Sequence, residues 1–298
     1  MKSVLCLGSE GHIGSRLVPH LRAEGYKVST VDTGWYYGGS PHLKLDYRLL
    51  GAPVIREFDA VVLLAAHSSV QMCENDPAGS WLNNVENFRQ LLGKLSHKQI
   101  LIYASSGSLL QGNTKNFSEN APFQPPLNHY DMQKQVIEMI AAKSGKRTVG
   151  LRFGTVCGSS PNPRLELMIT SMFLAAQEGE IQVANPEKHR AILGMNDLTR
   201  AIQRVLEAPP EGQEVYNLCS FDSTMIDIAK RVGDYCNAPI RINSPSPTYD
   251  FSMWNFKFRD AYDYEFRDSV ESICQDLEGL THYNKSVYNR STNLVKYE

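Results

Sequence analysis

The chain has 298 residues, of which 42% are hydrophobic and 21% charged, and this is enough for one large domain or two lobes with a sizeable core. A net charge of −2 argues against a basic surface for nucleic acid, and we predict no nucleic-acid partner. No window approaches the roughly 18 apolar residues of a membrane span, and the N-terminal run "MKSVLCLG" is too short for a signal peptide. The 6 cysteines form no Cys-x-x-Cys pair, which indicates reduced thiols and no metal site. We therefore expect a soluble, cytoplasmic protein.

The first half of the chain alternates short apolar runs with helical patterns. The runs that predict buried strands are 3–7, 27–31, 42–45, 59–65, 99–105 and 148–153. The helical stretches between them are 12–25, 80–95 and 130–144. This alternation predicts an α/β fold, namely a Rossmann-type doubly wound parallel sheet with helices on both faces.

The pattern loosens after about residue 155, where proline-rich connections appear at 159–164, 208–212 and 244–250. Helices are expected near 164–178, 196–207, 222–235 and 268–278. We predict a cofactor-binding domain over 1–155 and a smaller substrate lobe over 156–298, with some segments returning to the first domain. The polar stretch 281–298 is expected to be surface or poorly ordered.

A glycine motif follows the first strand in "LGSEGHIGSRL", with Gly8, Gly11 and Gly14 at three-residue spacing. Gly8 permits a tight turn, Gly11 lets a pyrophosphate approach the backbone, and Gly14 lets helix and strand pack closely. The helix that follows points its N-terminal amides at the phosphates. The context of strand, glycines and amphipathic helix predicts a dinucleotide site.

Asp32 ends the second strand, 18 residues beyond Gly14. A carboxylate at this point accepts hydrogen bonds from both hydroxyls of an adenosine ribose and repels a 2′-phosphate. Between Asp32 and the end of "TGWYYGGS" there is no arginine or lysine. The sequence therefore favours NAD over NADP.

Tyr130 and Lys134 are four residues apart, so on a helix they share one face. A lysine beside a phenol lowers the phenol's pKa, because the positive charge favours the tyrosinate. This spacing alone is common by chance, and it gains meaning only from the glycine motif and Asp32.

Together these motifs resemble extended short-chain dehydrogenase/reductases of the NAD-dependent epimerase/dehydratase family, chiefly enzymes of nucleotide sugars. The resemblance runs from Gly8 to about Leu277 and is carried further by "LDYR" (45–48), "DAVVLLAAHSSV" (59–70), "NNVENFRQLL" (83–92), "LRFGTVCG" (151–158), "HRAILGMNDLTRAI" (189–202) and "VYNLCSFDST" (215–224). It implies a homodimer formed through 80–95 and 130–144, a nucleotide-sugar substrate and bound NAD. The cofactor contacts that we expect are Gly8, Gly11, His12, Ile13, Gly14, Asp32, Asp46, Tyr47, Leu64, Ala65, Ala66, Asn84, Tyr130 and Lys134.

The resemblance also implies a catalytic triad of a serine, Tyr130 and Lys134. The serine lies in "IYASSGSLLQG", and counting from the strand end selects Ser106, with Ser105 and Ser108 as alternatives. In this family the tyrosine moves the proton of the reacting hydroxyl, the lysine bonds the nicotinamide ribose, and the serine holds the reacting oxygen.

Two arginines are candidates for the substrate diphosphate, Arg190 from the resemblance and Arg164 by its charge, although Arg164 alone also suits an ordinary surface cation. We expect a nucleotide-sugar epimerase, with C4 as the reacting carbon. A ketoreductase or dehydrogenase of a sugar nucleotide or another hydroxy or keto substrate is the alternative. A 4,6-dehydratase is disfavoured because Gly107 and Ser108 replace the family's Asp-Glu pair, and a non-catalytic NAD-binding protein stays open. Gly154, Thr155 and Cys157 depart from the family pattern and leave the sugar and base undecided.

Overall fold

The computed structural model describes residues 2–34, 43–113 and 117–282. The predicted polar tail lies outside this part of the chain from residue 283 onward.

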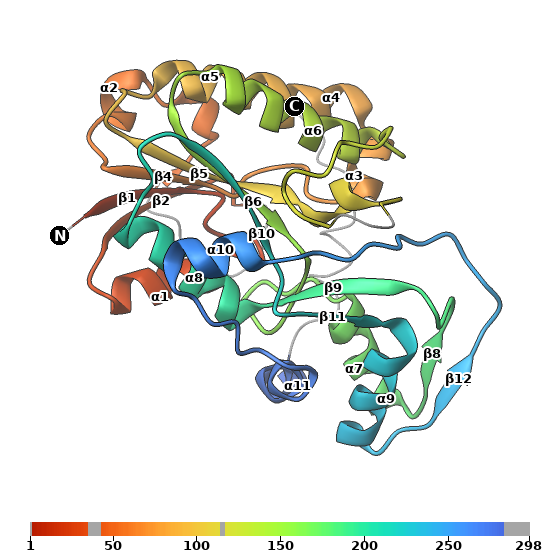
Figure 1. Cartoon of the computed structure of the whole chain (residues 1–298). Helices are drawn as coiled ribbons and strands as arrows, with labels where there is room; N and C mark the ends of the chain where they lie inside the picture. The colour runs from red at the N-terminus through yellow and green to blue at the C-terminus, as the bar shows by residue number, and fades with distance from the viewer. Residues whose placement is uncertain (1, 35–42, 114–116, 283–298) are drawn as a thin grey trace.

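The centre of the molecule is a seven-stranded parallel sheet in the order β10-β6-β5-β4-β1-β2-β3 (Figure 1). Its order reverses between β1 and β4, and in such sheets ligands bind in the crevice at the carboxyl ends of the strands beside this switch point. The doubly wound α/β prediction is confirmed. The strands are β1 (Ser3–Leu7), β2 (Lys27–Asp32), β3 (Leu43–Lys44), β4 (Ala60–Leu63), β5 (Ile100–Ser106), β6 (Arg147–Phe153) and β10 (Gln213–Leu218).

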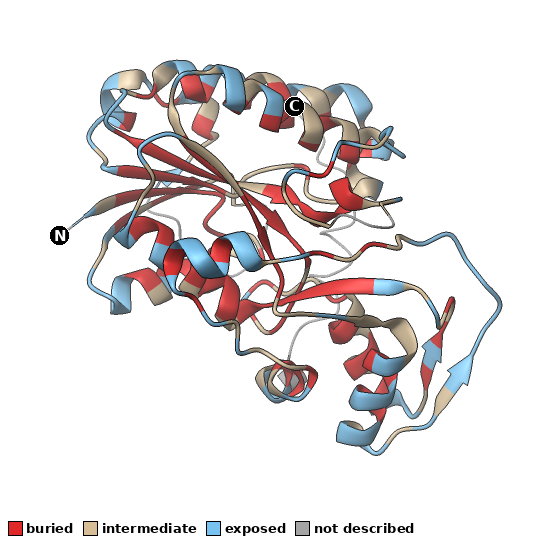
Figure 2. Ribbon diagram, in the orientation of Figure 1, coloured by how far each residue is buried: buried red, intermediate tan, exposed pale blue. Residues whose placement is uncertain are grey.

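Alternating side chains of the strands build a core on each face of the sheet. In β1, Val4 and Cys6 pack with Leu17 of α1, whereas Leu5 packs on the opposite face with Leu91 of α5. The central strands are correspondingly buried on both faces, whereas both residues of the edge strand β3 are exposed (Figure 2). One face is covered by α2 (Ala52–Ile55), α4 (Pro77–Trp81), α5 (Asn87–Lys94) and α6 (His129–Lys143), and the other by α1 (Gly14–Ala23), α8 (Met195–Glu207) and α10 (Phe256–Tyr262).

The helix predicted over 80–95 is not continuous. A π-helical segment, η2 (Leu82–Glu86), separates α4 from α5. Asn84 in this segment is buried, and its amide accepts the backbone N–H of His67 at 2.8 Å and donates to Gln133 Oε1 at 2.6 Å. The wide turn thus serves contacts with distant residues, which the local sequence pattern does not reveal. Such turns occur often at functional sites.

The smaller lobe has its own core beneath the carboxyl ends of the main strands. It contains the sheet β11 (Phe221–Thr224), β9 (His189–Gly194) and β7 (Thr155–Cys157), and the pair β12 (Ile240–Ile242) and β8 (Ile181–Val183). Its helices are α7 (Met168–Glu178), α9 (Met225–Cys236) and α11 (Val270–Leu277).

The second half of the chain is divided between the two lobes. β10, α8 and α10 return to the main domain, and the boundary that we expected between residues 155 and 156 falls inside β7. The helix expected over 164–178 begins only at Met168, and the stretch 222–235 is divided between β11 and α9. Proximity in sequence therefore does not assign a segment to a lobe.

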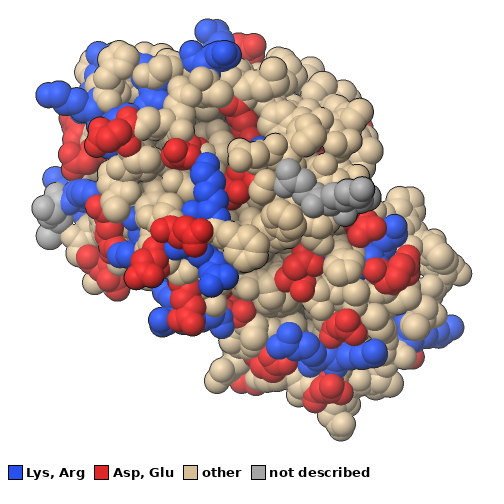
Figure 3. All heavy atoms as spheres, viewed as in Figure 1, with Lys and Arg blue, Asp and Glu red and all other residues tan. Residues whose placement is uncertain are grey.

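Lysine, arginine and acidic side chains lie interspersed on the face shown in Figure 3. Within the described residues, no helix combines the length and apolarity needed to cross a bilayer. In the same part of the chain, no three histidine, cysteine or acidic side chains gather as a metal site would need.

Candidate active site

A cavity of about 600 Å³ opens at the carboxyl ends of the central strands. Its walls come from the glycine loop, the ends of β2, β4, β5 and β6, the start of α6, and segments of the smaller lobe. The cavity therefore lies at the switch point where this fold places its ligands.

The three glycines of the loop differ in what the fold requires of them. Gly8 has φ +89°, and a Cβ there would lie 2.4 Å from the backbone nitrogen of Ala65. A Cβ on Gly14 would lie 2.2 Å from the carbonyl oxygen of Gly8. A Cβ on Gly11 would meet nothing closer than 3.6 Å. Packing thus requires Gly8 and Gly14, whereas Gly11 leaves room on the cavity wall for a ligand.

Asp32 is tied to the glycine loop at the end of β2. Its Oδ2 accepts the backbone N–H of Glu10 at 2.9 Å, and its Oδ1 accepts that of Gly34 at 2.8 Å. Sequence reasoning missed Lys44, which pairs in register with Asp32 and packs over Gly34. It lies beyond the cation-free segment 33–40, and only the pairing of β2 with β3 brings it beside Asp32.

His12 lies between the second and third glycines and lines the cavity. Its Nδ1 is 3.0 Å from Ser160 Oγ, and its buried Nε2 has no hydrogen-bond partner among the described residues. Burial and the charge of Arg164 lower the pKa of His12 to about 3, so the ring is neutral. A neutral, unpaired nitrogen in this loop is available to a bound cofactor.

The expected contacts on β3, β4 and the following turns are largely on the cavity wall, with one exception. Asp46 caps η1 (Tyr47–Leu49) by accepting the N–H of Arg48 at 3.0 Å. Asn84 is the exception, because it is absent from the walls of the large cavity and its amide bonds to His67 and Gln133. The expected contact of Asn84 with the cofactor stays a prediction; in the structure its amide anchors the loop after β4. The residues that do line the cavity include Ile13, Asp46, Tyr47, Leu64, Ala65 and Ala66.

The serines at the end of β5 differ in their hydrogen-bond partners. Ser105 donates to the buried carboxylate of Glu138. All three serines line the cavity, and the hydroxyl oxygens of Ser106 and Ser108 are 2.7 Å apart. Gly107 between them is enclosed, since a Cβ there would lie 2.3 Å from Met253 Sδ.

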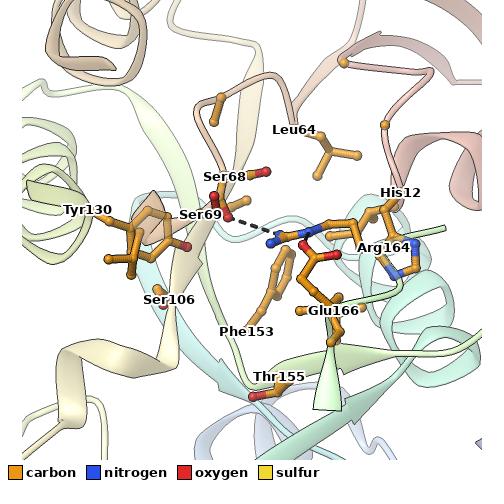
Figure 4. A pocket seen from close by; sticks show the side chains of 18 of the residues that line it. His12, Leu64, Ser68, Ser69, Ser106, Tyr130, Phe153, Thr155, Arg164 and Glu166 are labelled. Atoms are coloured by element: carbon orange, nitrogen blue, oxygen red, sulfur yellow. Dashed lines mark hydrogen bonds and ion pairs between the residues drawn. The ribbon is translucent and has the colours of Figure 1, made fainter. Parts of the chain in front are cut away.

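Tyr130 and Lys134 lie in the first turns of α6, which Asn128 caps by accepting the N–H of Asp131 at 2.9 Å. Both residues line the cavity, and Figure 4 shows the Tyr130 ring beside Ser106 on one wall. Lys134 Nζ lies 5.6 Å from the centroid of the Tyr130 ring and donates to the carbonyl of Ala104 at 2.7 Å. The residues of the expected triad are thus brought together.

The electrostatics of this pair differ from the sequence-based expectation. Burial raises the pKa of Tyr130, and the Asp131 carboxylate raises it further, whereas hydrogen bonding with Ser106 and the charge of Arg164 lower it. Burial also lowers the pKa of Lys134 to about 8. The expected downward shift of the phenol's pKa is therefore wrong for the protein alone, because enclosing the phenolate outweighs the nearby cations.

The two candidate arginines have different surroundings. Arg164 Nε pairs with Glu166 Oε1 at 2.7 Å, and its Nη1 donates to the carbonyl of Ser68 at 3.1 Å (Figure 4). Arg190 lies over the rings of Tyr249 and Phe251, with its guanidinium carbon 5.7 and 5.6 Å from their centroids.

The two arginines differ in whether a donor remains for an anionic ligand. The Arg190 Nη2 donates to the hydroxyl of Thr248, and its buried Nη1 has no partner among the described residues. Burial lowers the pKa of Arg190 to about 10, so it stays charged at neutral pH. Arg190 is therefore better prepared than Arg164, whose charge Glu166 already balances.

The site fits a dinucleotide with a second anionic ligand beside it. Gly11 and the unpaired His12 Nε2 suit a phosphate-bearing group, Asp32 suits a ribose, and Arg190 suits a further anion. Tyr130, Lys134 and Ser106 place a proton-handling group on the same cavity wall.

Comparison with known proteins agrees with this geometry. The model of the NAD dependent epimerase/dehydratase family matches residues 4–219. A UDP-glucose 4-epimerase of Lactobacillus helveticus is 30% identical over 53% of this chain and 52% of its own length. A UDP-glucose 4-epimerase of Lacticaseibacillus casei is 28% identical over 54% of this chain and 53% of its own length. The chain thus spans about half the length of the curated relatives that it matches.

Solved structures share the fold over nearly the whole chain. An NAD-dependent NDP-hexosamine 5,6-dehydratase of tunicamycin biosynthesis superposes with a TM-score of 0.83 at 20% identity, covering 96% of this chain and 100% of that one. A UDP-glucose-4-epimerase of Stenotrophomonas maltophila with bound NAD has a TM-score of 0.80 at 20% identity, and the match covers 93% of this chain and 96% of that one. At this identity the likeness concerns the fold.

Proposed function

This chain belongs to the NAD-dependent epimerase/dehydratase family, and on that premise we propose that it is a nucleotide-sugar epimerase acting at C4. The observation that carries the proposal is the convergence of Ser106, Tyr130 and Lys134 on the wall of a cavity that also holds the glycine loop and Arg190. Bound NAD supplies the hydride acceptor and a positive charge.

Tyr130 is the proposed acid and base. As phenolate it removes the proton from the substrate hydroxyl, and as phenol it returns a proton to the resulting ketone. Burial raises its pKa above the ordinary value, which supports a phenol as the form present in the protein without cofactor. Lowering the pKa of an ordinary phenol by three units takes about 4 kcal/mol of stabilisation of the phenolate. Lys134 and the positive charge of the cofactor contribute to this stabilisation in the enclosed site.

Lys134 and Ser106 have positioning roles in this proposal. Lys134 is held by the carbonyl of Ala104, close to where the nicotinamide ribose is expected, and remains charged below pH about 8. Ser106 lies beside Tyr130 and contacts the same reacting oxygen. Holding that oxygen between two side chains keeps the substrate aligned for reaction.

Arg190 is the proposed ligand of the substrate diphosphate. Its guanidinium is oriented by two aromatic rings and Thr248, and one buried nitrogen still needs an acceptor. A diphosphate satisfies such a donor with a charge-assisted hydrogen bond. An uncharged substrate would leave it unpaired, and this argues against a steroid-type alcohol.

Redox-neutral epimerisation is favoured over dehydration by the loop after β5. A carboxylate cannot replace Gly107 without displacing Met253 and Phe251. Ser108 at the next position carries no carboxylate and is bonded to Asp131. A ketoreductase uses the same triad once and differs in the fate of the hydride.

The test is a panel of UDP- and dTDP-sugars incubated with the NAD-loaded protein and followed by proton NMR. An epimerase gives the C4 epimer with no net formation of NADH, whereas a ketoreductase changes the absorbance of the reduced nicotinamide. Tyr130→Phe should abolish conversion while retaining NAD. Tyr235→Phe is the matched control, because its hydroxyl bonds Glu278 on the exposed surface of α9. Full conversion by Tyr130→Phe would refute the mechanism.

We also propose a homodimer formed through α5 and α6, which lie side by side on one face of the sheet (Figure 1). Met139 of α6 is 59% exposed, and Leu82 of the adjoining π-helical segment is 46% exposed. Met139→Glu should shift sedimentation toward the monomer, and an unchanged dimer would reject this interface.

A further inference from the structure

The connection between β12 and α10 crosses from the smaller lobe to the main domain (Figure 1). It is exposed over 243–248 and becomes partly buried at Tyr249 and Asp250. The Asp250 carboxylate is bonded to β9, because its Oδ1 accepts the backbone N–H of His189 at 2.9 Å. The backbone N–H of Asp250 donates to Gln111 Oε1, in the loop after β5, at 2.6 Å. Tyr249 thus belongs to a segment that is attached to both lobes, and it lines the cavity between them.

The hydroxyl of Tyr249 is bonded to the first turn of α6, the helix that carries Tyr130. It donates to the Asp131 carboxylate, at 3.1 Å from Oδ1 and 3.0 Å from Oδ2. It accepts a hydrogen from the side-chain amide of Asn128 at 2.6 Å. The orientation of this amide is settled, because its oxygen accepts the backbone N–H of Asp131 at 2.9 Å and its nitrogen therefore faces Tyr249. The hydroxyl is thus both a donor and an acceptor toward α6.

These bonds do not suit the Tyr249 hydroxyl to a role as a second acid or base. Burial and the Asp131 carboxylate raise the pKa of Tyr249 above its ordinary value, so the hydroxyl keeps its hydrogen at neutral pH. Asp131 has further donors in the Ser108 hydroxyl at 2.6 Å and the Asn128 amide at 2.9 Å. Removing the Tyr249 hydroxyl would therefore leave the carboxylate with partners.

The ring of Tyr249 supports the arginine that is proposed to bind the substrate diphosphate. The guanidinium carbon of Arg190 lies 5.7 Å from the centroid of this ring. Phe251 packs edge-on against the same ring, with 6.3 Å between the centroids. The buried Nη1 of Arg190 has no partner among the described residues. One side chain therefore contacts both parts of the site, Arg190 through its ring and the start of α6 through its hydroxyl.

We propose that Tyr249 is a positioning residue that holds Arg190 in place for an anion relative to the first turn of α6. The bonds to Asn128 and Asp131 fix the ring, and the fixed ring supports the guanidinium. A donor that is ordered before its ligand arrives loses less conformational freedom on binding. Placement of the sugar beside Tyr130 by this arrangement rests on the proposed function, whereas the ordering of Arg190 for an anion does not.

Tyr249→Phe tests the hydroxyl alone. It keeps a ring under the guanidinium and removes the two bonds to α6, so more of the ordering of Arg190 must occur when the anion binds. The probe is UDP, titrated by calorimetry into the NAD-loaded protein. We expect the Kd for UDP to rise about three- to tenfold, the range that follows from ordering one long side chain.

The same substitution in an Arg190→Met protein shows whether Tyr249 acts through Arg190. Without the guanidinium, Tyr249→Phe should change the Kd for UDP by less than about 1.5-fold, because the group that the ring supports is gone. A general loss of structure would instead weaken UDP binding by the same factor in both proteins. Inorganic pyrophosphate is the second probe, since it offers a diphosphate without a nucleoside.

Tyr264→Phe is the matched control. Tyr264 also has an arginine over its ring, with the guanidinium carbon of Arg200 at 5.2 Å from the centroid. Its hydroxyl donates to the carbonyl of Asp197 at 2.8 Å, and it is not among the residues that line the cavity. The Kd for UDP should be unchanged in this variant.

The outcomes distinguish the two proposals. A rise in the Kd that Tyr249→Phe causes only when Arg190 is present supports the positioning role. An equal rise in both proteins, no rise in either, or the same rise in Tyr264→Phe overturns it. A parent protein that binds neither UDP nor pyrophosphate overturns it together with the assignment of Arg190. A protein that shows the expected dependence on Arg190 and epimerises no sugar supports the positioning role and contradicts only the proposed function.

Discussion

Replacing Gly11 by alanine should separate cofactor binding from folding. A Cβ on Gly11 meets no atom closer than 3.6 Å, and its φ is not positive, so the fold accepts alanine. Exchanging glycine for alanine at such a position stabilises a protein by roughly 0.4–1 kcal/mol, because the unfolded chain loses freedom. For a domain of this size we expect the Tm without NAD to rise by about 1–3 °C.

Binding of NAD should change in the opposite direction. The new methyl group projects into the cavity where the pyrophosphate is expected, and the backbone amides lose their close approach. We expect the Kd for NAD to increase at least about tenfold, which corresponds to about 1.4 kcal/mol. Isothermal titration calorimetry measures the Kd, and differential scanning calorimetry with and without NAD measures the two Tm values.

Gly14→Ala is the matched comparison in the same loop. Its Cβ would lie 2.2 Å from the carbonyl oxygen of Gly8, so the loop or helix α1 must move. Overpacking of this kind costs about 1–3 kcal/mol, and we expect a lower Tm even without NAD. If Gly11→Ala binds NAD as tightly as the parent protein, the pyrophosphate does not lie against Gly11 and the cofactor placement is refuted.

Further predictions concern the buried charges. Arg152→Met should cost about 3–5 kcal/mol in urea unfolding, because Glu138, paired with it at 2.7 Å, would stay buried without a cation and with only the Ser105 hydroxyl donating to it; Glu138→Gln in the same protein should recover part of this, and an additive double variant would contradict the reasoning. Lys134→Met should stabilise the protein at pH 7 by about 1–3 kcal/mol while removing activity, because burial lowers the lysine's pKa from 10.5 to about 8 and folding disfavours its charge. Since the unfolded chain holds this proton more tightly, the parent's stability rises with pH between about 8 and 10.5, and the gain measured by thermal unfolding should shrink over that window; a constant gain would show that the lysine's charge is not its source. Arg190→Lys should weaken UDP binding about 10- to 100-fold by calorimetry, since a lysine cannot present the unpaired Nη1, and unchanged affinity would remove Arg190 from the diphosphate site.

Much of the main domain could be predicted from the order of residues alone. Apolar runs of four to seven residues mark the central parallel strands, because helices cover both faces of that part of the sheet. The spacing of the glycines can be read from the sequence, because a tight turn and a close contact between strand and helix both require residues without a Cβ. The structure shows both demands, at Gly8 with its positive φ and at Gly14 against the Gly8 carbonyl. The pair Tyr130 and Lys134 also follows from helical spacing, which requires no tertiary information.

The tertiary structure decided which partners these residues meet. Three serines within four positions look alike in sequence and all line the cavity, and only packing pairs Ser105 with Glu138 and Ser108 with Asp131. The direction of the Tyr130 pKa shift likewise depends on burial by segments far along the chain, which outweighs the opposing effects of Ser106 and Arg164. Hydrogen bonding and desolvation act over a few ångströms in space, and the residues that approach within that range are set by the fold.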